Sequence, residues 1–394
     1  MVRDALIRSG LEKTNWDLLA CSMPSNVLLL TGYWPAAGYS MALATCEGRI
    51  LLIVPEDEDE FAEYSWADDV RTYCPAPLDR LLTAEEPVFE AFADLKADMR
   101  MIADRIGFEQ AEAFEPAAYA PYLFRGSAAR ILRRAFPSAT LAPADELLAE
   151  MRAVKTPAEL DHIRTACLIT EQAFRRGADL MKPGFTEIET AACFRAALSH
   201  CVTGFSGVRR CDGFVYCMSG PNAARGWGPY SRSGNRMVKN GDFVIVRCHS
   251  YADGYWVDVS RTYHFGPLQP SKRQMLEAVT AAHEAAIAAI RPGVRGGELD
   301  HVARMPIESY GFGALIRHAT GHGAGFGTLD HTARPRLHPK SNDVLEPGMV
   351  LKLELGVYSD EAGVRKSDIV AVTESGANVL TRFHCSFSEL TLGT

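Results

Sequence analysis

The sequence predicts an α/β N-terminal domain over residues 1–150, followed by an α+β C-terminal domain with an internal pseudo-duplication over residues 151–394. Three observations support this. A chain of 394 residues exceeds what one hydrophobic core ordinarily holds. Before residue 150, short apolar runs alternate with helical stretches. After it, two helices followed by strands occur twice, although no sequence repeat accompanies them.

In the first domain, apolar runs bounded by turn residues predict strands, and a longer amphipathic stretch predicts a helix. The expected strands are at 26–33, at 39–55 as a hairpin that turns at Glu47-Gly48, at 70–74 and at 101–109, and the expected helix is at 127–136.

The second domain begins with a helix signal. Thr156 is followed by a proline and, three residues on, by Glu159, which is the pattern of a capping box. A second box, from Thr186 to Glu189, opens the next helix. Later helices are expected from Ser271 to the stop at residues 292–293 and over 298–310, and later strands over 317–331, 348–358 and 364–373.

Between those helix pairs, residues 241–263 read GDFVIVRCHSYADGYWVDVSRTY and predict a hairpin. Asp253-Gly254 is a turn pair, and β-branched and aromatic residues flank it on both sides. Since strand side chains alternate between faces, we expect Arg247 and Asp258 to lie opposite each other on one face.

Composition argues against two classes of partner and favours one compartment. The formal net charge is −8 and no long basic run is present, so we expect no nucleic-acid partner. Apolar runs are only strand-length, so we expect no membrane association. The ten cysteines form no CxxC pair, and the first residues lack an apolar signal core, which favours a reducing cytoplasm.

Five stretches carry a resemblance to a known family. They are SNVLLLTGY, RAVKTPAELDHIRTA, the 241–263 hairpin, HATGHGAGFG, and EPGMVLKLELGVY followed by GVRKSDIVAVTESG. Together they resemble the pita-bread fold family of aminopeptidase P, prolidase, methionine aminopeptidase and creatinase. The resemblance implies a creatinase-N-like first domain, a pita-bread catalytic second domain and a homodimer.

In the metallopeptidases of that family, the resemblance implies two metal ions held by five residues. The corresponding positions here match at Asp258, His322 and Glu354 and depart at Arg247 and Ser367. A guanidinium keeps its proton at any accessible pH and repels a cation. We therefore expect no metal and no cofactor; if one ion binds after all, its expected ligands are Asp258, His322 and Glu354.

Within the family, FGTLDH at 326–331 and the cysteine after Arg247 resemble creatinase, which is metal-free. The resemblance implies a metal-independent hydrolase that cleaves a C–N bond of a small non-peptide nitrogen compound: an amidine, a cyclic amidine or an N-substituted amino acid. Two positions depart from creatinase. Residues 225–234 contain no histidine, and Ser260 stands where creatinase has a catalytic glutamate.

The catalytic residues expected on this hypothesis are His322, Glu354, Asp258 and Arg247. His322 acts as acid and base, Glu354 or Asp258 orients it, and Arg247 fixes a substrate carboxylate or an oxyanion. Residues expected at the substrate are His318, His331, Trp227, Tyr230 and Arg365. The two aromatic residues are suited to a cationic nitrogen, and Arg365 to bracing the carboxylates.

Three other readings stay open. One is a single-metal Xaa-Pro dipeptidase or aminopeptidase, and a lyase of the same fold stands beside it. Another is a non-catalytic binding protein. In that case Arg247, Asp258 and Glu354 form a structural ion-pair cluster in place of a lost metal site.

Overall fold

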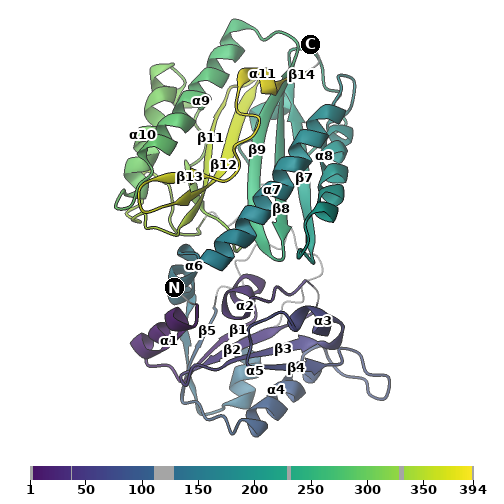
Figure 1. Ribbon diagram of the computed structural model, residues 1–394, viewed down its shortest axis with the longest axis vertical. Coiled ribbons are helices and arrows are strands. Elements are labelled where there is room, and N and C mark those ends of the chain that lie inside the picture. Colours follow the sequence, from purple (N-terminus) through teal and green to yellow (C-terminus); the bar gives the residue numbers. More distant parts are fainter. Residues whose placement is uncertain (1–2, 37, 111–127, 229–231, 328–331, 393–394) are drawn as a thin grey trace. The chain divides into compact units, whose positions relative to one another are not determined.

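The chain folds as two units, Met1–Arg152 and Ala153–Thr394. The computed structural model in Figure 1 describes residues 3–36, 38–110, 128–228, 232–327 and 332–392. The division falls close to residue 150, where the sequence changes from alternating strands and helices to the first capping box.

The first unit is built on a mixed sheet whose strand order is β4-β3-β2-β1-β5-β6. Its central hairpin, β2–β3, follows the prediction, and Gly48 supplies the positive φ of +86° that the turn needs. The strands are β1 (Leu18–Cys21), β2 (Met41–Thr45), β3 (Ile50–Pro55), β4 (Asp69–Tyr73), β5 (Arg105–Phe108) and β6 (Thr140–Pro143).

Helices surround this sheet, and apolar residues of α4 and α5 pack with it in one core. The helices are α1 (Arg3–Thr14), α2 (Pro24–Thr31), α3 (Asp59–Ala62), α4 (Glu86–Asp98), α5 (Ala128–Ala135) and α6 (Asp145–Ala153). The α/β class expected for this half is thus observed.

The strand expected at residues 26–33 is wrong, because this segment forms α2. Pro24 occupies the first turn of the helix, where its missing N–H costs nothing. The carboxylate of Glu109 accepts hydrogen bonds from the Met23 amide at 2.6 Å and from Asn26 Nδ2 at 2.7 Å, and so caps the helix N-terminus. A short apolar run cannot be assigned by periodicity alone, and this cap comes from a residue far away in the sequence.

The second unit carries a larger sheet, in the order β10-β11-β12-β9-β8-β7, with β13 beside β12 and β14 beside β9. Its elements are α7 (Pro157–Leu180), α8 (Glu187–Cys201), β7 (Cys211–Ser219), η5 (Gly220–Arg225), β8 (Phe243–Ala252), β9 (Tyr255–Phe265), α9 (Pro270–Ala289), α10 (Gly296–Ser309), β10 (Gly321–Gly323), β11 (Val350–Tyr358), β12 (Gly363–Val372), β13 (Ala377–Val379), α11 (Phe387–Leu390) and β14 (Thr391–Leu392). Two helices and then strands occur twice, and β9 and β12 meet in the middle, as the pseudo-duplication predicts.

The local signals for α7, α8 and the β8–β9 hairpin are confirmed. Both capping boxes form, at Thr156 and at Thr186. The hairpin turns at Asp253 and Gly254, whose φ angles are +48° and +86°. The register differs from the expectation, because Arg247 pairs with Ser260 and Asp258 pairs with His249. Arg247 and Asp258 are therefore diagonal neighbours on one face and not directly opposite.

The helices of the second unit lie on one face of its sheet. Thr170 of α7 hydrogen-bonds Ser250 at 2.6 Å, and His283 of α9 lies 3.0 Å from Asp368. Ser250 on β8 and Asp368 on β12 have the opposite parity to Arg247 and Ser367. The face that carries Arg247 is therefore the one turned away from α7 and α9.

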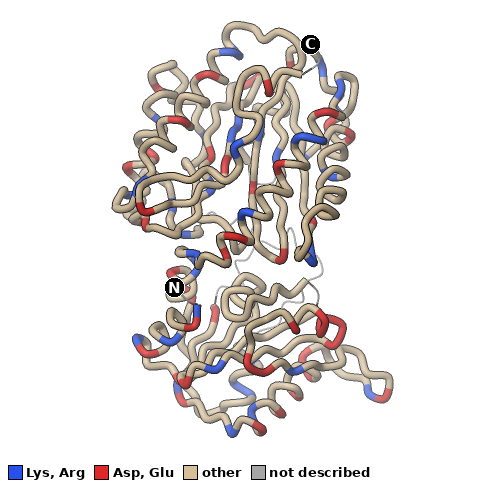
Figure 2. Tube along the Cα trace, viewed as in Figure 1, with Lys and Arg blue, Asp and Glu red and all other residues tan. Residues whose placement is uncertain are grey.

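Charge is mixed in both units. Figure 2 shows Lys and Arg positions interspersed with Asp and Glu positions along the chain. In the part of the chain that the structure describes, no helix combines the length and apolar character needed to cross a bilayer.

Candidate active site

A row of polar residues crosses the sheet of the second unit. In register from β8 to β11 it runs through Arg247, Ser260, Ser367 and Glu354. Asp258, Lys352 and Arg365 each stand two positions from a member of this row and so share its face. All seven are buried. Strand alternation and the register of the paired strands together gather a charged cluster on the face opposite the helices.

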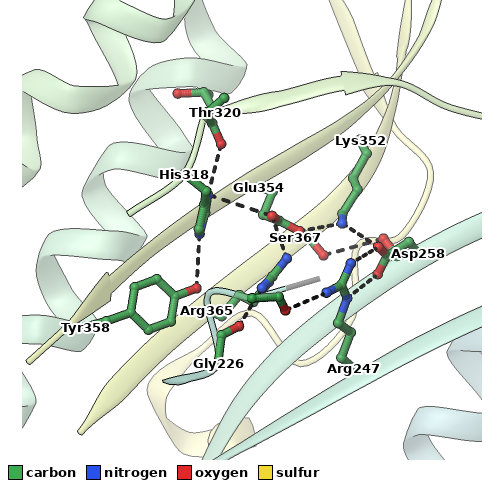
Figure 3. Close-up of polar contacts among 12 residues, drawn as sticks. Gly226, Arg247, Asp258, His318, Thr320, Lys352, Glu354, Tyr358, Arg365 and Ser367 are labelled. Carbon is green, nitrogen blue, oxygen red and sulfur yellow. Dashed lines mark hydrogen bonds and ion pairs between the residues drawn. The ribbon is translucent and has the colours of Figure 1, made fainter. Parts of the chain in front are cut away.

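Asp258 is held by two cations from different strands (Figure 3). Arg247 makes a two-point contact, with Nη2 2.8 Å from Oδ2 and Nε 3.3 Å from Oδ1. The ammonium of Lys352 contacts the same Oδ2. His249 Nδ1 lies 3.4 Å from it. The forked geometry of Arg247 is the one that arginine uses to bind carboxylates.

Glu354 is held in the same way. Arg365 Nη2 lies 2.5 Å from Oε1, and the ammonium of Lys352 contacts Oε2. His318 Nδ1 lies 3.7 Å from Oε1. Lys352 therefore contacts both carboxylates, and each carboxylate also pairs with one arginine (Figure 3).

These contacts set the protonation states. Burial acts to raise the pKa of Asp258, but the positive charges of Arg247 and Lys352 hold it well below its usual range. Burial likewise acts against ionisation of Glu354, and Arg365 and Lys352 hold its pKa well below normal. Burial lowers the pKa of Lys352, while both carboxylates favour its charged form. Both carboxyl groups are therefore ionised at neutral pH.

Two histidines beside the cluster, His318 and His249, are neutral. Burial lowers the pKa of His318 to about 4, outweighing the attraction of Glu354. Burial, with Arg247 and Lys352 adding to it, lowers the pKa of His249 well below normal. The charged cluster consequently contains three cations and two anions, and its net charge is positive. The cations are Arg247, Lys352 and Arg365, and the anions are Asp258 and Glu354.

A loop after β7 contributes two backbone carbonyls to the cluster. Arg365 Nη1 donates to Gly226 O at 2.5 Å, and Arg247 Nη1 approaches Gly228 O at 3.5 Å. The buried carboxylate of Glu187 holds both sides of this loop, accepting from the Ser219 amide at 2.7 Å and from the Gly234 amide at 2.9 Å. Glu187 thereby supports the segment that meets the two arginines.

Three buried polar atoms of Ser260, Arg365 and Glu354 have no hydrogen-bond partner among the described residues: Ser260 Oγ, Arg365 Nε and Glu354 Oε2, the last of which is in ion-pair contact with Lys352. Buried polar groups in native proteins are almost always satisfied, so such atoms call for an explanation. Two of the three, Ser260 Oγ and Arg365 Nε, can donate a hydrogen bond to a ligand.

His322, the expected acid and base, lies on the short edge strand β10 in register with Lys352. Its Nδ1 donates to Gly323 O at 2.8 Å, so in the neutral ring Nε2 carries the lone pair. The Gly323 carbonyl thus orients the ring of His322, a role that we expected Glu354 or Asp258 to have.

The residues expected at the substrate differ in exposure and hydrogen bonding, and two of them lie outside the described residues. Both ring nitrogens of His318 are already engaged, since Nδ1 donates to Ala319 O at 2.9 Å and Nε2 accepts from Tyr358 OH at 3.0 Å. Trp227, between the two glycines that meet the arginines, is 46% exposed. Tyr230 and His331 lie outside the described residues.

Sequence reasoning missed Lys352, His249 and Tyr358. A signal for Lys352 was present, because a lysine in the apolar strand VLKLELGVY stands two residues before Glu354 and must share its face. His249 has the same relation to Arg247. Tyr358 gave no comparable signal, because its contact with His318 depends on how β11 meets the segment before β10.

Fold and site together define a two-domain protein of the pita-bread class with a buried ion-pair cluster on its large sheet. Residues 161–374 match the model of metallopeptidase family M24, and residues 3–154 match the creatinase/prolidase N-terminal domain. The chain belongs to metallopeptidase family M24.

Relatives and solved structures agree with this. The Xaa-Pro dipeptidase of Pyrococcus furiosus is 30% identical over 239 residues, which is 60% of this chain and 66% of that protein. The uncharacterized peptidase YqhT of Bacillus subtilis is 29% identical over 278 residues, 70% of this chain and 72% of that protein. The crystal structure of the prolidase from Pyrococcus horikoshii OT3 superposes with a TM-score of 0.76 at 25% identity, covering 96% of this chain and 98% of that one.

These findings correct one prediction and confirm another. A metal-independent hydrolase of a small non-peptide compound is wrong, because the family is one of metallopeptidases and the relatives are named as dipeptidases and prolidases. An enzyme of the hydrolase class acting on C–N bonds is confirmed, since peptidases are such enzymes.

The residues present were tested against the metal ions that the family implies. Among the described residues, no group of three or more His, Cys, Asp and Glu side chains has the arrangement to hold an ion. The ammonium of Lys352 contacts both carboxylates that could serve as ligands, and Arg247 replaces a third. The cluster as it stands does not fit a divalent ion.

Proposed function

We propose that this chain hydrolyses a small peptide with a free carboxylate, of the Xaa-Pro dipeptide class, and receives that carboxylate at the charged cluster. The observation that carries the proposal is the positive excess of the cluster, in which three cations face two carboxylates. Buried charge without compensation is costly, so an anionic ligand is the partner that this arrangement favours.

The donors of the cluster suit such a ligand. Arg365 Nε and Ser260 Oγ are buried, and neither has a partner among the described residues. A carboxylate accepts hydrogen bonds at both oxygens and can satisfy an N–H and an O–H together. The named relatives make a dipeptide the natural form for that carboxylate.

His322 is proposed to move the proton in this reaction. Cleavage of a peptide C–N bond requires a proton at the leaving nitrogen, and an imidazole can deliver one near neutral pH. Its Nδ1 donates to Gly323 O, so Nε2 is proposed to take a proton from the water that attacks the carbonyl carbon and to pass it to the leaving nitrogen as the C–N bond breaks. Positive groups beside it are suited to stabilise the oxyanion that forms at the carbonyl.

The test is a substrate pair that differs only in charge. Ala-Pro and Ala-Pro amide are offered to the purified chain, with and without added manganese, and released amino acids are measured by chromatography. We expect the free acid to be cleaved with a kcat/KM about 30-fold or more above that of the amide, since losing a buried charge partner costs about 2 kcal/mol or more.

Equal values for acid and amide would contradict the proposed role of the cluster. Binding of Ala-Pro in a calorimeter without turnover in any condition would identify a binding protein and not a hydrolase. Incorporation of oxygen from labelled water into the product separates hydrolysis from elimination by a lyase of the same fold.

We also propose, from the family resemblance, that the enzyme is a homodimer and works in the cytoplasm. All ten cysteines are free thiols, which suits a reducing compartment. Light scattering after size exclusion tests the first point, and fractionation of the source cells tests the second.

A further inference from the structure

Lys352 has a position that a family template does not predict. It lies on β11, two residues before Glu354, in a strand whose other side chains near it are apolar. Its side chain is 1% exposed, and its ammonium contacts Asp258 Oδ2 and Glu354 Oε2. One cation therefore joins two carboxylates that come from different strands (Figure 3).

The remaining carboxylate oxygens are also held by cations. Asp258 Oδ1 accepts from Arg247 Nε, and Glu354 Oε1 accepts from Arg365. Each carboxylate thus pairs with one arginine as well as with Lys352. An ion that entered between the carboxylates would have to take the place of the ammonium.

The neighbouring positions support the same conclusion. Ser367 lies in register with Glu354 and offers a hydroxyl where a carboxylate would add a further negative charge. Arg247 adds a positive charge on the other side. The guanidinium of Arg247 and a divalent ion bound to Asp258 would be like charges close together in a buried site, where they repel strongly.

We infer that Lys352 is an internal counter-ion that occupies the position between Asp258 and Glu354, and that a divalent ion binds there only in competition with its ammonium. The inference concerns the same site as the proposed function but does not depend on the substrate. Lys352 is a positioning residue for both carboxylates, because it fixes their separation.

The experiment compares manganese affinity in three forms of the full chain after chelator treatment: wild type, Lys352→Met and Lys366→Met. Titration calorimetry gives the dissociation constant, and elemental mass spectrometry gives the stoichiometry. Lys366 is the matched control, a lysine on β12 of opposite parity to Arg365 and Ser367. We expect Lys352→Met to bind manganese at least tenfold more tightly than wild type, and Lys366→Met to match wild type.

The substitution leaves two arginines facing two carboxylates, so the cluster becomes charge-balanced and is expected to fold. A second comparison, Arg247→Asp against Arg247→Asp with Lys352→Met, repeats the test with one more carboxylate on β8, and again the form without the lysine is expected to bind more tightly. Equal affinities within both pairs would overturn the inference. A chain that cleaves no dipeptide would leave this result unaffected, so the two proposals fail separately.

Discussion

Replacing Glu187 by glutamine tests whether a buried carboxylate holds the loop that meets the site arginines. Among the described residues, all of the hydrogen-bond partners of Glu187 are donors: the Ser219 amide and hydroxyl on Oε1, Asn222 Nδ2 on both oxygens, and the Gly234 amide on Oε2. Glutamine has the same shape but turns one acceptor into a donor. One N–H of the loop must then face another N–H.

The cost can be worked from these contacts. A hydrogen bond to a charged group contributes about 1.5–3 kcal/mol, and one to a neutral acceptor about 0.5–1.5 kcal/mol. Glu187→Gln loses the bond to Gly234 and weakens those to Ser219. We expect the free energy of unfolding to fall by about 2–4 kcal/mol.

A matched control lies two residues further along the same helix. Glu189 is exposed and completes the capping box with Thr186, so Glu189→Gln is expected to cost no more than about 1 kcal/mol. Urea unfolding followed by circular dichroism measures both variants. Hydrogen exchange of residues 219–228 should accelerate only in Glu187→Gln. Equal losses in the two variants, or unchanged exchange in the loop, would refute this account.

Two further predictions concern charges away from the cluster. Arg261→Met should lower the free energy of unfolding by about 3–5 kcal/mol, because Arg261 donates to buried Asp368 at 2.6 Å and to the Thr381 and Phe383 carbonyls. Urea unfolding measures the loss, and a value below about 1 kcal/mol would contradict this prediction. Hydrogen bonding to Arg336 lowers the pKa of Asp343 to about 2, so this pair stabilises the fold above the unfolded pKa near 4, and its contribution is lost as the pH falls toward 2. Since Arg336 is 45% exposed, Asp343→Asn should cost at most about 1 kcal/mol at pH 7, and a gap to wild type that stays constant from pH 5 to pH 2 would show that the pair is not its source.

The fold could be predicted where the signal is local. A capping box uses residues three apart, and a two-residue turn needs positive φ at neighbouring positions, so Thr156, Thr186 and Asp253-Gly254 identify their elements without knowledge of the rest of the chain. The segment at 26–33 failed for the opposite reason. Its helix is capped by Glu109, and that contact exists only once β5 lies beside β1.

The site likewise combines features that a local pattern predicts with contacts that depend on distant strands. Alternation within the predicted hairpin correctly puts Arg247 and Asp258 on one face, and applied to VLKLELGVY it puts Lys352 on the same face of its strand as Glu354. What alternation cannot give is the partner of that lysine. Its contact with Asp258 depends on how β11, β12 and β9 meet. A comparison restricted to the family's metal-ligand positions also overlooks Lys352, because Lys352 is not at one of those positions.

A substitution at a ligand position is therefore best interpreted together with every charged neighbour on the same face. Arg247 alone predicts repulsion of one ion, which leaves room for a second ion on Asp258, His322 and Glu354. Lys352 changes that conclusion, because its ammonium contacts both remaining carboxylates. Three possible metal ligands remain in the sequence, but their number does not decide whether a divalent ion binds. The ion must displace the ammonium of Lys352 from Asp258 and Glu354 in order to bind.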